Sequence, residues 1–221
     1  MEVEINTEEK QISLEERIVE HYKKHLLENG VEPPSIYAFC KDLEIEESEF
    51  YDYFNDFHQL AGVFWVHTFK DVKNRMAADV EFANFSVREK LLSFYYGFFE
   101  MLKKNRSYAL LSFSESKSIL NHQPKNLKVL KEEYMDWAKD LVSEGIANEE
   151  IAGRLKISDT YNNIFWLQLL FLINFWIKDD SRGFEKTDVA IEKSVHFSFD
   201  LIEKNALDSA IDFGKFLFQN R

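Results

Sequence analysis

The spacing of apolar and polar residues along the chain predicts a series of helices, beginning with three short ones. Ile18, Tyr22 and Leu26 recur at the helical interval between a capping-box pattern at residues 13–16 and Gly30. Two prolines then force an extended connection, after which the pattern predicts helices over residues 36–43 and 46–54. We therefore expect a small three-helix unit at the N-terminal end.

Longer helices are expected in the rest of the chain. The apolar spacing predicts helices over residues 56–82, 86–102, 106–120, 124–143 and 161–177, and a final helical region over 185–218 with a break near Asn205. Seven glycines and three prolines provide little turn chemistry for a many-stranded fold. We expect an all-α protein of about nine helices. The expected domains are a small one over residues 1–55 and a larger one over residues 56–221.

The composition favours a cytoplasmic protein that does not cross a membrane. Cys40 is the single cysteine, which excludes an intramolecular disulfide, and the N-terminal segment is acidic where a signal peptide needs basic and apolar residues. The most apolar stretch, residues 164–177, spans 14 residues and includes Gln168 and Asn174, whereas a bilayer crossing takes about 20. It is interpreted as a buried helix.

Negative charge is concentrated at the N-terminal end of the chain. The first 60 residues contain five Lys or Arg and 16 Asp or Glu, which gives a net charge of −11, and the whole chain carries −12. The rest of the chain is therefore close to neutral. Acids of this number oppose binding to nucleic acid, because phosphates repel them.

Residues 30–54 carry a recognisable spacing of glycine, serine and aromatic residues. Gly30, a helix opened by Ser35 and the run Phe50-Tyr-Asp-Tyr-Phe54 stand in one register without a gap. This pattern resembles the helix-turn-helix of the tetracycline-repressor family of bacterial transcriptional regulators. A weaker likeness continues at residues 144–145, 153–155 and 175–181. The resemblance implies a homodimer with a DNA-reading domain and a larger helical domain for dimerisation and ligand binding.

The same resemblance identifies the residues expected to face DNA, which are Ser35, Glu46, Glu47, Ser48, Glu49, Tyr51, Tyr53 and Phe57. The family's turn glycine corresponds to Glu44 here, its following Ser or Thr to Glu46, and its phosphate-binding Lys to Phe57. Because Lys and Arg supply most of the affinity for DNA, we expect weak or specialised duplex binding. The alternative is that these acids only solvate an exposed face.

A different class of function is also compatible with this sequence. A protein of this fold that does not bind DNA would hold an apolar or lipid-like molecule, or a protein partner. It would resemble the lipid-binding ubiquinone-biosynthesis proteins that share the fold. The surface potential around the third helix, and DNA binding at two salt concentrations, distinguish the two functions.

Aromatic residues crowd the three middle helices and could line an effector pocket. The candidate lining residues are Tyr95, Phe98, Phe99, Tyr108, Phe113, Tyr134 and Trp137. The resemblance places the family's pocket among these helices, and Tyr and Trp offer polar tips to an apolar cavity. The alternative is an ordinary core, since helical aromatics mostly pack against one another.

The helix over residues 161–177 is apolar nearly all round, so one face should cover the core and another should meet a partner. The candidate dimer-interface residues are Phe165, Leu169, Phe171, Leu172, Phe175 and Trp176. The resemblance implies that this helix and the last one pair with their copies in a four-helix bundle. The sequence does not indicate which face of the helix meets the partner.

Two histidines, His21 and His25, lie four residues apart on the first predicted helix. The residues between them are Tyr-Lys-Lys, where helical zinc sites of this spacing have a general-base Glu, so ordinary surface histidines are expected. The chain has no nucleophile elbow, phosphate-binding Gly loop or Cys-His pattern. We expect no enzyme activity, no cofactor and no metal site.

Overall fold

The computed structural model describes residues 12–113, 125–153 and 158–202, and the regular structure of these residues is helical throughout. The α-helices are α1 (Leu14–Asn29), α2 (Ile36–Leu43), α3 (Glu47–Tyr51), α4 (Phe57–Ala78), α5 (Val87–Lys104), α6 (Arg106–Phe113), α7 (Lys128–Ala147), α8 (Ser158–Lys178) and α9 (Glu185–Ile202). Short 3-10 helices are η1 (Val80–Asn84), η2 (Lys125–Leu127) and η3 (Arg182–Phe184). The expectation of an all-α fold with about nine helices is confirmed for the described residues.

The N-terminal unit forms as its capping signals predict. Ser13 and Glu16 satisfy each other's backbone N–H groups at the start of α1, and Gly30 ends the helix in the left-handed conformation with φ 72°. Ile18, Tyr22 and Leu26 of α1 are buried against α2, α3 and the start of α4. The three short helices therefore share a small core of their own.

The ends of several helices differ from the sequence-based expectation. The helix expected over 46–54 is shorter in the structure. It is α3, about one and a half turns long, because Glu46 is the N-cap and a turn begins at Asp52. The first long helix ends at Ala78, where Asp79 starts η1. The helix α7 begins later than expected and continues through Gly145 to Ala147. The expected extensions of α6 over 114–120 and of the last helix over 203–218 lie outside the described residues.

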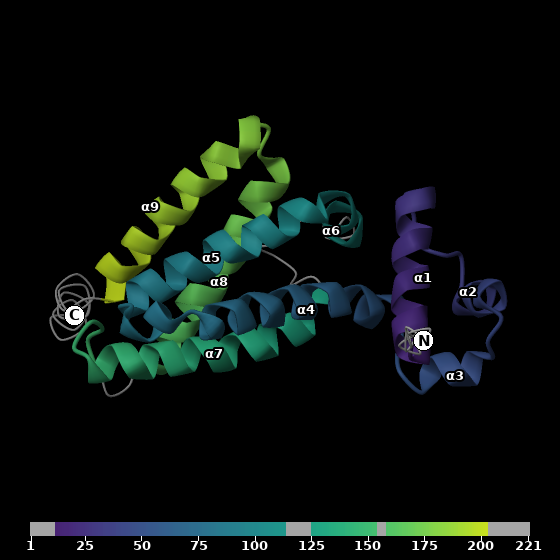
Figure 1. Cartoon of the computed structure of the whole chain (residues 1–221), viewed down its shortest axis with the longest axis horizontal. Helices are drawn as coiled ribbons and strands as arrows, with labels where there is room; N and C mark the ends of the chain where they lie inside the picture. The colour runs from purple at the N-terminus through teal and green to yellow at the C-terminus, as the bar shows by residue number, and fades with distance from the viewer. Residues whose placement is uncertain (1–11, 114–124, 154–157, 203–221) are drawn as a thin grey trace, which may run out of the picture.

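The long helix α4 joins the N-terminal unit to the larger helical bundle (Figure 1). Trp65 and Phe69 of α4 lie in the large core with residues of α5, α7, α8 and α9, whereas Leu60 and Ala61 lie in the small core of the N-terminal unit. Tyr108 of α6 also belongs to the small core. The two cores are thus distinct but connected through α4 and α6. The boundary expected at residues 55 and 56 stays a prediction.

No helix among the described residues is long and apolar enough to span a bilayer. The helix α8 is the most apolar one, but it is covered on one side by α7 and on the other by α9. The cytoplasmic location stays a prediction from the composition.

A close approach between α4 and η2 gives a test of this packing. The Cβ of an alanine at position 62 would lie 2.8 Å from the backbone carbonyl oxygen of Asn126. We expect Gly62→Ala to lower the free energy of unfolding by about 1 to 3 kcal/mol, although Ala is favoured over Gly in a helix by about 1 kcal/mol. Urea titration followed by circular dichroism measures the change.

Gly97→Ala is the matched control for this substitution. Its new Cβ would meet only the side chain of Val72, at 3.1 Å, and a side chain can shift more easily than a backbone carbonyl. We expect Gly97→Ala to lower the free energy of unfolding less than Gly62→Ala does. Equal or higher stability of Gly62→Ala would show that α4 and η2 are not packed this closely.

Candidate functional site

The outer face of α2 and α3 presents most of the residues expected to face DNA. Glu46, Ser48 and Glu49 are exposed, and Glu47 is half-buried. Tyr51 and Tyr53 at the end of α3 are 48% and 46% exposed. Within α3 and the turn before it, residues 44–51, there is no Lys or Arg. This face therefore combines carboxylates with exposed tyrosine rings.

The side chains of Ser35, Glu46 and Glu49 also have structural roles on this face. Ser35 accepts a hydrogen bond from the backbone N–H of Ala38 and caps α2. Glu49 accepts one from the backbone N–H of Glu46, and these two form a capping box at the start of α3. The turn residue Glu44 adopts φ 57°, the left-handed conformation in which the family has glycine. The turn geometry is kept with a different residue.

Phe57, which the resemblance places among the DNA-facing residues, is partly buried. Its ring stacks on Tyr22 at 5.4 Å and lies edge-on to Phe39 and Phe50, at 5.6 and 6.1 Å between ring centroids. Phe57 is therefore part of the packing around the small core. A large ring is better accommodated by this aromatic cluster than by a polar surface.

The acids of α3 impose a negative potential on the interior of the N-terminal unit. Cys40 is 1% exposed, and burial raises the pKa of its thiol. The negative charges of Glu47, Glu46 and Glu49 raise this pKa further. The same field acts on any phosphate that approaches the outer face.

The two histidines of α1 do not meet in a metal site. His21 Nε2 lies 2.9 Å from a carboxylate oxygen of Asp42, and its ring lies 5.2 Å from that of Phe39. The side chain of His25 is half-buried. No group of three or more His, Cys, Asp or Glu in the described part of the chain is arranged to hold a metal ion.

The aromatic residues expected to line a pocket fill the protein core instead. All seven are at most 9% exposed: Tyr95, Phe98, Phe99, Tyr108, Phe113, Tyr134 and Trp137. Six of them lie in the large core, where they pack on neighbouring rings, but Tyr108 packs edge-on to Phe64 in the small core at 5.0 Å. None of the seven lines the open groove described below. The plain-core alternative describes these residues better.

Two tyrosines form a polar cluster inside the large core. The hydroxyl oxygens of Tyr95 and Tyr134 are 2.9 Å apart, and both lie within hydrogen-bonding distance of the backbone carbonyl oxygen of Phe165, at 3.3 and 3.2 Å. Burial raises the pKa of both phenols, well above the ordinary value for Tyr95. Both stay neutral and act as hydrogen-bond donors.

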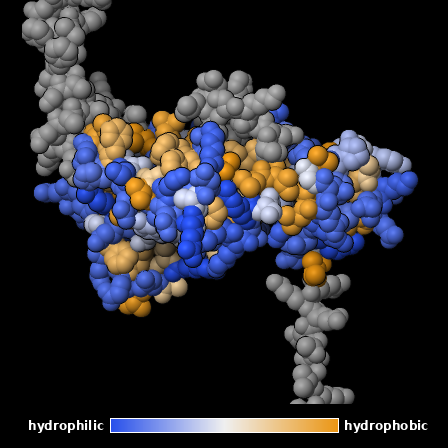
Figure 2. Space-filling model, turned by 90° about the horizontal axis from the view of Figure 1, so that it is seen from above, coloured by the Kyte–Doolittle hydropathy of each residue, from blue (hydrophilic) through white to orange (hydrophobic). Residues whose placement is uncertain are grey.

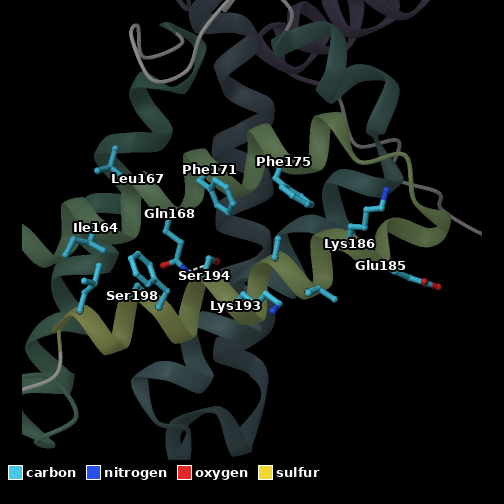
Figure 3. A pocket seen from close by; sticks show the side chains of 14 residues that line it. Ile164, Leu167, Gln168, Phe171, Phe175, Glu185, Lys186, Lys193, Ser194 and Ser198 are labelled. Atoms are coloured by element: carbon cyan, nitrogen blue, oxygen red, sulfur yellow. Dashed lines mark hydrogen bonds between the residues drawn. The ribbon is translucent and has the colours of Figure 1, made fainter. Parts of the chain in front are cut away.

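An open apolar groove of about 1050 Å³ lies between α8 and α9 (Figure 3). Its α8 side is lined by Ile164, Leu167, Gln168, Phe171 and Phe175, and its α9 side by Glu185, Lys186, Val189, Ala190, Lys193, Ser194, Phe197, Ser198 and Leu201. Figure 2 shows hydrophobic side chains exposed between hydrophilic ones on the larger domain. Such an exposed apolar surface is typical of an interaction site.

The burial pattern of α8 corrects the expected dimer-interface residues. Four of the six are at most 1% exposed and pack in the protomer's own core, namely Phe165, Leu169, Leu172 and Trp176. Phe171 and Phe175 lie on the open face of the helix. The sequence-based list missed Leu167 on α8, and Val189 and Phe197 on α9, which are 57%, 48% and 63% exposed. The apolar pair Val189 and Phe197, two helical turns apart, was the available signal.

The turn between α8 and α9 is fixed by Asp179, which is buried. Its carboxylate accepts hydrogen bonds from the backbone N–H and hydroxyl groups of Ser181 and Thr187. Burial favours the protonated acid, but these donors outweigh burial and lower the pKa of Asp179 to about 2. This turn sets the angle between the two helices that form the groove.

Comparisons with known proteins relate the chain to one family and one fold. A family model described as "Tetracyclin repressor-like, C-terminal domain" matches residues 90–217. A structure described as a candidate TetR-family transcriptional regulator from Syntrophomonas wolfei has a TM-score of 0.60 and 16% identity, covering 85% of this chain and 93% of that chain. A protein of unknown function from Rhodococcus sp. RHA1 has a TM-score of 0.55 and 12% identity, and the match covers 90% of this chain and 100% of that chain. A search of curated proteins finds no match.

The pKa of Asp179 leads to a prediction about stability and pH. Because its pKa is lowered from 3.8 to about 2, the stabilisation is complete above pH 3.8 and is lost as the pH falls towards 2. We expect Asp179→Asn to reduce the free energy of unfolding by about 2 kcal/mol at neutral pH and to remove this part of the acid dependence. Urea titrations at several pH values measure both effects.

Asp180→Asn is the control, since Asp180 is the exposed neighbour on the same turn. It should change the stability much less. A variant Asp179→Asn with the same acid dependence as the parent chain would show that these hydrogen bonds do not stabilise the turn.

Proposed function

The chain belongs to the tetracycline-repressor-like family, and we propose that it is a transcriptional regulator that works as a homodimer and binds duplex DNA weakly. The single observation that supports a dimer is the open apolar groove on α8 and α9. The observation behind weak DNA binding is the acidic outer face of α3. A regulator of this kind would need high local concentration, a specialised site or a partner protein to occupy DNA.

The groove supports the dimer on energetic grounds. Leu167, Phe171 and Phe197 are each at least half exposed in the single chain, and burying the exposed half of a large apolar side chain contributes about 1 kcal/mol each. An isologous dimer covers the same surface on both copies at once. In the proposed dimer, α8 and α9, which are joined by the Asp179 turn, would meet their copies in a four-helix contact.

The acidic face argues against tight DNA binding on electrostatic grounds. Affinity for duplex DNA arises largely from Lys and Arg that displace counterions from phosphates. By the resemblance, the carboxylates of Glu46, Glu47 and Glu49 take the positions of such contacts, and the partly buried Phe57 ring stacks on Tyr22. These carboxylates would repel DNA phosphates, and residues 44–51 contain no Lys or Arg that would attract them.

A protein partner is the second candidate for this face. Tyr37 of α2 is 64% exposed, and Tyr51 and Tyr53 lie near the same acids. Exposed tyrosines are enriched in protein interfaces, and carboxylates around them complement a basic surface. This observation favours the alternative in which the N-terminal unit binds a protein instead of DNA.

The ligand response implied by the family stays a prediction. The seven aromatic residues expected around an effector are packed against other core side chains, so they do not by themselves support a pocket. An apolar or lipid-like ligand also remains the alternative occupant of the large domain. A shift in Trp fluorescence across a panel of fatty acids and isoprenoids tests it.

The DNA proposal can be tested by reversing charge on α3. Glu47 and Asp52 are suitable because neither side chain takes part in the capping box of α3. We expect the parent chain to bind mixed-sequence duplex weakly, and Glu47→Lys with Asp52→Lys to raise the affinity and steepen its salt dependence by about two units per subunit. Fluorescence anisotropy at several salt concentrations measures both quantities.

A pair of exposed acids on α7 provides the matched control. Glu132→Lys with Asp136→Lys makes the same change in net charge outside the N-terminal unit, and it should leave the salt dependence nearly unchanged. Submicromolar binding by the parent chain near physiological salt, with a steep salt slope, would contradict the proposal of weak binding.

The dimer proposal can be tested by placing a charge in the groove. Phe171 is 50% exposed, so Phe171→Glu should leave the protomer folded. It would bury two carboxylates in an apolar interface, and we expect the dissociation constant to rise by at least about a hundredfold. Sedimentation velocity measures the dimer, and circular dichroism verifies the fold.

The control is Asn163→Glu, an exposed position of the same helix that does not line the groove. It should leave the dimer intact. A parent chain that stays a 26.2 kDa monomer at micromolar concentration would refute the dimer itself.

A further inference from the structure

The chain continues beyond α9 from one end of the apolar groove. Leu201 lines the groove, and α9 ends at the next residue, Ile202. The backbone carbonyl oxygen of Ile202 accepts a hydrogen bond from the backbone N–H of Ala152 at 3.3 Å. In a longer α9 that oxygen would accept from the N–H four residues further on. This contact marks the end of α9, and residues 203–221 follow from that end of the groove.

The sequence of this C-terminal segment has the pattern of an amphipathic helix. After Glu-Lys-Asn at 203–205, pairs of small or apolar residues recur every three or four positions. These pairs are Ala206 and Leu207, Ala210 and Ile211, Phe213 and Gly214, and Leu217 and Phe218. The residues between them are polar except for Phe216. A helix with one apolar face gains most of its stability from the packing of that face, so this pattern calls for an apolar surface to cover it.

The length of the segment matches the length of the groove. A helix over residues 206–218 would be about 20 Å long, and the groove side of α9 from Glu185 to Leu201 is about 24 Å long. A connection of three residues, 203–205, is enough to reverse the chain between two antiparallel helices. The family match also continues past α9 to residue 217, so the segment belongs to the same domain as the groove.

We propose that residues 206–218 form a helix that docks in the groove between α8 and α9 of the same chain and competes there with a second copy. This inference rests on the proposed homodimer. Leu167, Phe171 and Phe197 are the large side chains that such a helix would cover. A segment attached through three residues acts at an effective concentration on the order of millimolar, so it occupies the groove ahead of a partner in dilute solution. The segment then sets the chain concentration at which dimers form.

A disulfide between the groove and the segment detects the docked helix directly. Ser194 lines the groove eight residues before the end of α9, and Gly214 lies eight residues after position 206, so an antiparallel pair places them level with each other. Both residues are small, so the large apolar side chains stay in place. Cys40, the single cysteine of the parent chain, is buried.

Under mild oxidation we expect Ser194→Cys with Gly214→Cys to form a bond within one chain at least about tenfold faster than Ser194→Cys with Ala206→Cys. Position 206 would lie about 12 Å away along the helix axis, whereas a disulfide needs Cα atoms about 4.4 to 6.8 Å apart. Non-reducing electrophoresis of the full chain and mass spectrometry of its peptides measure the bond. Equal rates for the two pairs, or bonds that join two chains, would overturn the inference.

The competition is tested by releasing the segment. Ile211→Glu places a charge in its apolar row, whereas Ser209→Glu adds the same charge on its polar side. We expect Ile211→Glu to lower the dissociation constant of the dimer at least about tenfold, and Ser209→Glu to change it less than about twofold. Sedimentation velocity measures both constants, and circular dichroism verifies the fold.

The outcomes separate this inference from the dimer proposal. An unchanged dissociation constant for Ile211→Glu would overturn the competition, and a higher one would show that the segment is part of the dimer interface instead. A chain that stays monomeric in every variant but forms the bond between positions 194 and 214 would support docking of the segment and refute only the dimer.

Discussion

The contact of two buried hydroxyl groups with one backbone carbonyl fixes the orientation of α8, and the rest of the large domain depends on that orientation. Tyr95 of α5 and Tyr134 of α7 converge on the carbonyl oxygen of Phe165. In an apolar core such a bond is directional where the surrounding packing is not, and an unpaired hydroxyl there would be costly. A helix that is apolar on every side has several acceptable rotations by burial alone. The tyrosine cluster selects the one that leaves Phe171 and Leu167 outside.

The opposite end of α8 is attached to the N-terminal unit through a short helix. Arg106, the first residue of α6, donates to the last carbonyl oxygens of α8, at Trp176 and Ile177, and its guanidinium group lies 4.4 Å from the ring centroid of Trp176. Tyr108, two residues later, packs in the small core with α1. The eight residues of α6 therefore connect the end of α8 to the N-terminal unit by direct contacts.

Local sequence signals such as helix caps predicted the helices well, because each signal depends only on residues within about one helical turn. The capping box opened by Ser13 forms as expected. The orientation of α8 could not be predicted in this way. Its fourteen consecutive residues are mostly apolar, so no alternation of apolar and polar positions indicates which face is buried. The sequence could not decide between a pocket and a plain core for a related reason. Large rings enclose a cavity or fill it depending on how closely helices distant in sequence approach one another. Here the ring centroids of Trp137 and Phe94 lie 4.6 Å apart, so these rings pack directly on each other.

The position of Phe57 links the charge of the N-terminal unit to its packing. By resemblance this is where the family has a lysine for a DNA phosphate, but here the ring is stacked on Tyr22 and edge-on to Phe39 and Phe50. A lysine placed there would lose three aromatic contacts, which contribute about 0.5 to 1.5 kcal/mol each beyond their apolar area. The position that corresponds to the family's lysine is thus occupied by a partly buried ring packed against the small core, and a single substitution to Lys would lose these contacts.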